Sequence, residues 1–113
     1  MASSLRKFRH VLRWLLEGSR GGFNRAKIIS AVLEEPMNAN QLTTILEVDY
    51  RTVRHHLDIL EKNGLITPVG ERYGKLYFPS FELEQNLDYL EEILNKFGIM
   101  LKNETRDDDV NEK

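Results

Sequence analysis

Two amphipathic segments separated by a short break lie within residues 42–66, and this run constrains the fold more than any other part of the chain. Apolar side chains recur at helical spacing in both segments, at Leu42, Ile45 and Leu46 and then at Val53, Leu57 and Leu60. Each segment therefore predicts a helix with one apolar face. Because the two helices follow each other so closely, we expect these faces to pack together as a helix-turn-helix.

The second helix of this pair has clear signals at both ends. Asp49 precedes it, and a carboxylate at this position accepts hydrogen bonds from first-turn N–H groups and faces the positive end of the helix dipole. Asn63 and Gly64 end it, because glycine readily adopts the left-handed conformation that closes a helix. We therefore expect a recognition helix over residues 50–63, about four turns long.

The outward face of this helix carries mostly hydrogen-bond donors. With the apolar stripe turned inward, the outward positions near its start are Tyr50, Arg51, Thr52, Arg54 and His55. A helix that enters the major groove of DNA places its N-terminal residues on base edges, and arginine binds guanine O6 and N7 with two hydrogen bonds. We expect base contacts first from Arg51 and Arg54, then from Tyr50 and His55, with Thr52 nearer the backbone.

The apolar period then changes from about 3.6 to 2, the period of β-strands. Residues 65–69 and 75–78 predict two short strands, and the glycine-bounded residues between them predict a hairpin turn. The whole hairpin, residues 65–79, would form a wing beside the recognition helix. Three side chains at its tip suit contacts to phosphates or to the minor groove: Arg72, Tyr73 and Lys75.

Residues 38–80 as a whole resemble the winged helix-turn-helix of the ArsR-type transcriptional regulators. The runs 49–57 and 60–66 and the hairpin 70–78 carry the resemblance, and the phrase Tyr73–Phe78 suggests the archaeal branch. The resemblance implies a mainly α fold with a small β-hairpin. It also implies binding to double-stranded DNA. If the N- and C-terminal helices form a dimer contact, as their apolar seams predict below, we expect a homodimer on a pseudo-palindromic operator.

The same resemblance implies roles for individual residues of the motif. Tyr50, Arg51, Arg54 and His55 correspond to the DNA-reading face, whereas His56 corresponds to a position that packs or hydrogen-bonds inside the motif. One departure is plain, because metal-sensing members use cysteines and this chain has none. Adjacent residues of a helix point about 100° apart, so His55 and His56 do not share one ion. We expect no metal site and no cofactor.

The rest of the chain predicts helices that flank this motif in one domain, residues 1–102. Apolar spacing predicts helices over about residues 3–17, 24–34 and 81–102, the last of them capped by Ser80. Arg25 and Lys27 lie near the start of the second of these helices, where they either contact the DNA backbone or belong to the scaffold. The acidic remainder, residues 103–113, predicts a flexible tail.

The first and last of these helices carry apolar seams. The seam of the last helix has a heptad-like spacing, and the two sets are Leu5, Phe8, Leu12 and Leu15 in the first helix and Leu83, Leu87, Leu90, Leu94, Phe97 and Leu101 in the last. A heptad seam packs against another helix. We expect the first and last helices of two chains to form a symmetric dimer interface, and the alternative is that the seam packs within its own subunit.

The distribution of charge is compatible with DNA binding, although the net charge is −2. From Met1 to Leu76 there are 12 Lys and Arg against 8 Asp and Glu, a balance of +4, and from Tyr77 to Lys113 there are 4 against 10, a balance of −6. The local charge of the binding surface matters more than the total. Neither a long apolar run nor a signal-peptide pattern is present, so we expect no membrane segment and a cytoplasmic location.

No arrangement of residues indicates catalysis. The glycines within residues 18–22 neither follow a strand nor end in the Gly-Lys-Ser/Thr of a phosphate-binding loop. We therefore expect a sequence-specific DNA-binding transcriptional regulator and not an enzyme. The alternative is a winged-helix protein-interaction module. A small-molecule effector with a pocket near Trp14 at the dimer interface is also left open, with no ligand indicated.

Overall fold

The computed structural model describes residues 2–71 and 74–101. The expected tail, residues 103–113, and the wing-tip residues Arg72 and Tyr73 lie outside the described residues. Among the helices that are described, none combines the length and the apolar character needed to cross a membrane.

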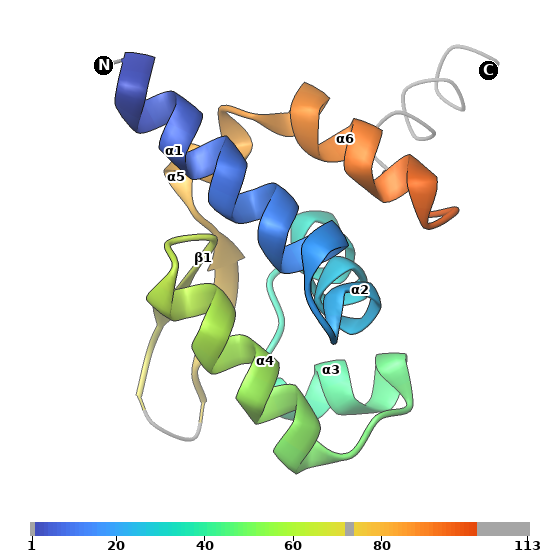
Figure 1. The fold of residues 1–113 in the computed structure, drawn as a ribbon. Helices are drawn as coiled ribbons and strands as arrows, with labels where there is room; N and C mark the ends of the chain where they lie inside the picture. Colours follow the sequence, from blue (N-terminus) through green and yellow to red (C-terminus); the bar gives the residue numbers. More distant parts are fainter. Residues whose placement is uncertain (1, 72–73, 102–113) are drawn as a thin grey trace, which may run out of the picture.

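Helices dominate the chain and one β-hairpin follows the helix-turn-helix (Figure 1). The elements in order are α1 (Ala2–Arg13), a short π-helix η1 (Trp14–Gly18), α2 (Gly22–Glu34), α3 (Ala39–Leu46), α4 (Tyr50–Lys62), β1 (Ile66–Val69), β2 (Leu76–Pro79), α5 (Phe81–Glu84) and α6 (Leu87–Lys96). The two strands are antiparallel, with Ile66 opposite Pro79 and Val69 opposite Leu76. The expected mainly α architecture with a small hairpin is confirmed.

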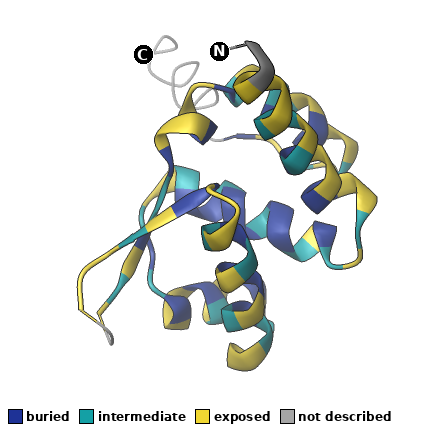
Figure 2. Cartoon of the chain, turned by 60° about the vertical axis from the view of Figure 1, so that its left-hand side comes forward, coloured by how far each residue is buried: buried dark blue, intermediate teal, exposed yellow. Residues whose placement is uncertain are grey.

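Helix α2 is the central helix of the domain. Its side chains Ala26, Ile28, Ile29 and Val32 are buried, and it contacts η1, α3, α4 and β2. Figure 2 shows buried residues on the inward faces of the helices, and exposed residues on their outer faces and on the outer part of the hairpin. The helix-turn-helix and the wing therefore share one core with the N-terminal part of the chain.

The chain reverses tightly between η1 and α2. Leu15 and Leu16 of η1 are buried, and the first residue of α2, Gly22, packs against the backbone of Leu16. A Cβ atom at position 22 would overlap the carbonyl oxygen of Leu16. Glycine is thus the residue that lets α2 start directly beneath the end of η1.

The C-terminal part differs from the single helix expected over residues 81–102. Ser80 caps α5 as expected, because its hydroxyl accepts a hydrogen bond from the N–H of Leu83 at 3.1 Å. The helix breaks after one turn, at Asn86, whose buried amide donates to the carbonyl of Glu82 and accepts from Arg9. Helix α6 then ends at Lys96, two residues before Gly98, which has a left-handed backbone (φ 78°).

Most of the seam residues expected at a dimer interface are buried inside the subunit, in line with the alternative that the seam packs within its own chain. Six of the ten are covered by the chain's own core: Leu12, Leu15, Leu83, Leu90, Leu94 and Leu101. Three more are partly buried against the same core, namely Phe8, Leu87 and Phe97. Only Leu5 is classed as exposed, at 46%. The seam is periodic because one face of α5 and α6 lies on the domain itself.

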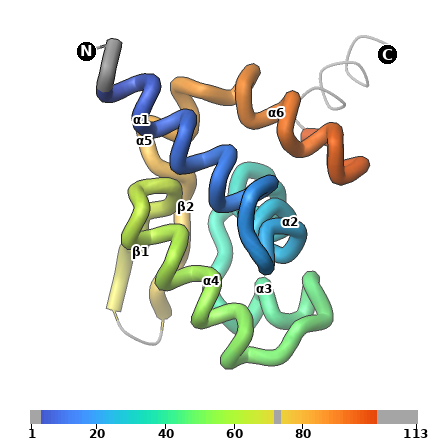
Figure 3. The backbone as a smooth tube through the Cα atoms, viewed as in Figure 1, coloured from blue at the N-terminus to red at the C-terminus, as the bar shows by residue number. Residues whose placement is uncertain are grey.

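The first and last helices were expected to meet between two chains. In the structure they contact each other within one chain. Helices α1 and α6 lie side by side (Figure 1). Arg9 donates to Asn86 at 2.8 Å and Arg13 to the Tyr89 hydroxyl at 2.9 Å. Both guanidinium groups also lie over the Tyr89 ring. This pairing sits at one end of the molecule, and α3, α4 and the hairpin sit at the other (Figure 3).

Candidate nucleic-acid interface

Two capped helix starts define the helix-turn-helix. Asn38 and Gln41 form a capping box at the start of α3, with each side chain bonded to the other residue's backbone N–H. Asp49 caps α4 as expected, because its carboxylate accepts from the N–H of Thr52 at 2.7 Å. That hydrogen bond holds the pKa of Asp49 below its ordinary value. The carboxylate at the start of α4 therefore serves as the N-cap of the helix.

The first two turns of α4 present three of the expected DNA-reading side chains to solvent. Arg51 and His55 are exposed, as is Tyr50, which keeps 51% of its surface accessible. Thr52 is half-buried. Arg51 and His55 supply hydrogen-bond donors, and Tyr50 adds a ring and a hydroxyl. This surface can therefore offer both directional and apolar contacts to a groove.

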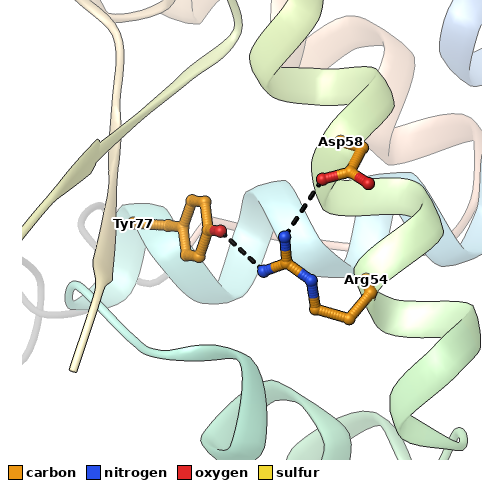
Figure 4. A network of polar contacts seen from close by, with 3 residues as sticks. All are labelled: Arg54, Asp58 and Tyr77. Carbon is orange, nitrogen blue, oxygen red and sulfur yellow. Dashed lines mark hydrogen bonds and ion pairs between the residues drawn. The ribbon is translucent and has the colours of Figure 1, made fainter. Parts of the chain in front are cut away.

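Arg54 differs from its neighbours because it is held by other side chains (Figure 4). Its Nη1 donates to the Tyr77 hydroxyl at 2.8 Å, and its Nη2 pairs with the Asp58 carboxylate at 3.1 Å. The hydrogen bond with Tyr77 raises the pKa of Arg54 above its ordinary value. The guanidinium is half-buried and points from the recognition helix toward the wing.

Tyr77 links three parts of the structure. Its side chain is fully buried. Its backbone N–H donates to the carbonyl of Met37 at 2.8 Å, and its own carbonyl accepts from Met37 at 3.4 Å. Through its hydroxyl it holds Arg54 on α4. Strand β2, the segment before α3 and the recognition helix are therefore joined at one residue.

A small hollow of about 60 Å³ opens where α3, α4 and β2 meet. It is lined by Asn38, Ala39, Asn40, Tyr50, Arg54, Lys75 and Tyr77. The structure thus brings three of the expected DNA-binding residues together here: Tyr50, Arg54 and Lys75. It leaves Arg51 and His55 outside the hollow, on the open face of α4.

Sequence reasoning missed Tyr77 and Asp58 as parts of this site. Asp58 stands four residues after Arg54, a spacing at which helical side chains meet, so the ion pair had a signal in the sequence. Tyr77 had a weaker signal, since alternation along β2 turns every second side chain inward. Nothing in the strand pattern, however, indicates that its hydroxyl meets an arginine on α4.

The sequence and fold of this region have counterparts among known proteins. Residues 24–67 match the family of bacterial regulatory proteins, arsR family, and this stretch covers α2, α3, α4 and the start of the hairpin. No curated protein matches the chain.

Several solved structures are similar to this one. HlyU from Vibrio cholerae, in its reduced form, is 18% identical, with a TM-score of 0.61 over 81% of this chain and 95% of that chain. The transcriptional regulator BldR from Sulfolobus solfataricus is 19% identical, with a TM-score of 0.60 over 85% and 69%. The transcriptional regulator SlyA is 16% identical, with a TM-score of 0.57 over 97% and 84%. The fold is a winged helix. At these identities the likeness concerns the fold alone.

A buried arginine anchors the recognition helix of this winged helix to its N-terminal turn. Arg25 is only 3% exposed. Its guanidinium donates to the carbonyls of Leu15 and Arg20, at 3.0 and 2.8 Å, and to the Ser19 hydroxyl at 2.6 Å. Its Nη1 donates to Nδ1 of His56 on α4 at 3.1 Å. Arg25 is thus part of the scaffold and not a DNA contact.

His56 lies inside the motif, as the family resemblance implied, and is 6% exposed. Burial, followed by the nearby charge of Arg25 and the neighbouring His55, lowers the pKa of His56. Lys27, the other cation near the start of α2, lies over the ring of Phe23 at 4.7 Å. Among the described residues, no three His, Cys, Asp or Glu side chains are grouped so as to hold a metal ion.

A second hollow lies beside Trp14, the residue near which the sequence analysis placed a possible pocket for a small-molecule effector. It has a volume of about 330 Å³ and is lined by His10, Arg13, Trp14, Glu17 and Gly18. Trp14 is 56% exposed, and its ring covers Gly18.

The His56 environment predicts a loss of stability in mild acid. Because the folded pKa lies below the ordinary value of 6.5, the unfolded chain binds more protons than the folded one as the pH falls. The contribution of His56 to the free energy of unfolding is therefore fully present above about pH 6.5. It is lost as the pH falls below that value, by up to about 1.4 kcal/mol per pH unit. Urea unfolding between neutral and mildly acidic pH measures this slope.

Two variants distinguish the pH dependence caused by His56 from that of other titrating groups. In His56→Asn the amide oxygen can still accept from Arg25 but does not titrate, so the slope contributed by His56 should vanish. In His10→Asn, a change at an exposed histidine, the slope should persist. An equal slope in His56→Asn and in the unchanged protein would show that His56 is not the group responsible.

Proposed function

We propose that this protein is a sequence-specific DNA-binding transcriptional regulator without enzymatic activity, acting in the cytoplasm. The observation that carries the proposal is the exposed face of the first two turns of α4, where Tyr50, Arg51 and His55 are accessible to solvent. The arsR-family match over residues 24–67 supports it. In this proposal α4 enters the major groove and the wing lies along the backbone or the minor groove.

Arg51 is the principal base-reading residue in this proposal. Its side chain is exposed on the first turn of α4, where helices of this type meet base edges. Arginine can contact a guanine with two hydrogen bonds, which discriminate against other bases by roughly 1–3 kcal/mol. Tyr50 and His55 flank it and would contact neighbouring positions.

Fluorescence anisotropy with labelled duplexes tests this assignment. A preferred duplex is first selected from a randomised pool, and its affinity is then compared with that of unrelated duplexes. Arg51→Ala should weaken binding to the preferred duplex by about 1–3 kcal/mol and reduce its advantage over the others. Lys62→Ala is the matched control, because it removes an exposed cation from the far end of the same helix, and it should leave that advantage unchanged.

The unmodified protein tests whether DNA is bound at all. Affinity should fall steeply as salt rises, because binding releases counterions from the phosphates. If no duplex binds at about 50 mM salt, where nonspecific contacts are strong, DNA binding is ruled out and the protein-interaction module becomes the function to pursue.

We further propose that the regulator acts as a homodimer on a two-fold symmetric operator, with its recognition helices about 34 Å apart in successive major grooves. The supporting observation is the apolar surface that the subunit leaves open on its N-terminal helices. Leu5 is 46% and Trp14 56% exposed, and Phe8 is only partly buried. This surface is smaller than the full seam expected from the sequence.

Sedimentation equilibrium tests the dimer. We expect twice the mass of the 13.2 kDa chain, and a shift toward the single-chain mass in Leu5→Glu, which places a charge on the proposed contact. Ile45→Glu is the control, since Ile45 is also exposed, at 54%, but belongs to α3. A single-chain mass for the unmodified protein at all concentrations would refute the dimer.

A further inference from the structure

The hollow between α3, α4 and β2 contains cationic groups from both the recognition helix and the wing. Arg54 comes from α4, and Lys75 immediately precedes β2. None of the described residues that line it is acidic. Lys75 forms no ion pair with any residue that the structure describes. Two cations that face one small polar space favour an anion there.

The size of the hollow limits what the anion can be. At about 60 Å³ it is far smaller than the several hundred Å³ of a typical small-molecule pocket. This size suits a single oxyanion group better than a nucleobase. The other polar lining residues, Asn38, Asn40 and Tyr50, carry donors suited to phosphate oxygens.

The geometry of Arg54 also disfavours base reading. Recognition of guanine uses two N–H groups of the guanidinium as a fork. Nη1 of Arg54 is bound to Tyr77 and Nη2 to Asp58, so two of its five N–H groups are already engaged and the guanidinium is held toward β2, away from the open face of α4. Three N–H groups remain, and Arg54 lines the hollow, so they are available to donate to one oxyanion there. The Asp58 carboxylate is largely exposed, at 65%, and such a surface pair opposes a second anion only weakly.

We propose that this hollow binds one backbone phosphate of duplex DNA through Arg54 and Lys75, and that the buried Tyr77 hydroxyl positions Arg54 for that contact. The inference rests on the proposed function and changes the role expected for Arg54 from base reading to phosphate binding. Tyr77 suits a positioning role because its ring is fully buried and its backbone is bonded on both sides to Met37.

Three variants test the assignment in the anisotropy experiment, each with the preferred duplex and with unrelated duplexes. Tyr77→Phe keeps the buried ring and removes the hydroxyl, and it should weaken binding to every duplex by about 2- to 10-fold. Lys75→Ala, at a half-buried residue just outside the strand, should weaken all duplexes alike. It should also lower the slope of log affinity against log salt by about 1. Asp58→Asn removes the other partner of Arg54 and should leave affinity equal or higher.

The outcomes separate this inference from the proposed function. If the unmodified protein binds DNA but Tyr77→Phe and Lys75→Ala bind as it does, the phosphate site is refuted and DNA binding stands. A fourth variant, Arg54→Ala, tests the role of Arg54 directly. If it lowers the preference among duplexes and keeps the salt slope, Arg54 reads bases and the inference is again refuted. If the unmodified protein binds no duplex, the proposed function fails first.

Inorganic phosphate distinguishes a DNA phosphate from a free oxyanion ligand. Thermal unfolding in phosphate and in chloride, at matched ionic strength, measures any stabilisation by the free ion. Little stabilisation of the unmodified protein, together with weaker duplex binding by Lys75→Ala, is the result expected for a site completed by DNA. Strong stabilisation that Lys75→Ala abolishes, with duplex affinity unchanged, would assign the site to a free oxyanion and overturn the proposal.

Discussion

The hydrogen bond between the Tyr77 hydroxyl and Arg54 sets the relation between wing and recognition helix. A two-stranded hairpin has little stability of its own, so its position depends on what it packs against. Here the Tyr77 ring is fully buried, the residue's backbone pairs with Met37, and its hydroxyl reaches α4 at 2.8 Å. A buried hydroxyl without a partner is costly, which favours the conformation in which Arg54 stays in contact. Strand β2 of the wing and the start of α4 are therefore joined directly at this contact.

A second polar network holds that surface to the N-terminal half of the domain. Arg25 is buried without a carboxylate partner in the hydrogen bonds described, and it is satisfied by two carbonyls, a hydroxyl and the imidazole of His56. Burial lowers the pKa of Arg25. Because one side chain bonds η1, the following turn and α4, a shift of the N-terminal helices would strain the same contacts that orient α4. In the proposed dimer, this network would connect subunit contacts to the reading face.

The sequence was most informative where the signals are local. Asp49 and Gly64 bracketed α4 to within one residue of the observed helix, and the change of period after it located the hairpin. It was least informative where several folds produce the same pattern. Leu83, Leu90 and Leu94 keep a heptad spacing whether they face a partner or their own core, and the break at Asn86 depends on a tertiary contact with Arg9. The roles of Arg25 and Arg54 were likewise set by residues distant in sequence, since His56 and Tyr77 lie 31 and 23 positions away.

In the proposed function, the first turns of α4 and the adjoining wing form the surface that meets DNA. The most direct measurement is an NMR titration of ¹⁵N-labelled protein with its preferred duplex, following each backbone amide. We expect the largest shifts at residues 50–55 and at Asn40 and Lys75, with small changes along α6. Changes concentrated on α1 and α6, with residues 50–55 unaffected, would contradict this expectation and place the binding surface at the opposite end of the molecule.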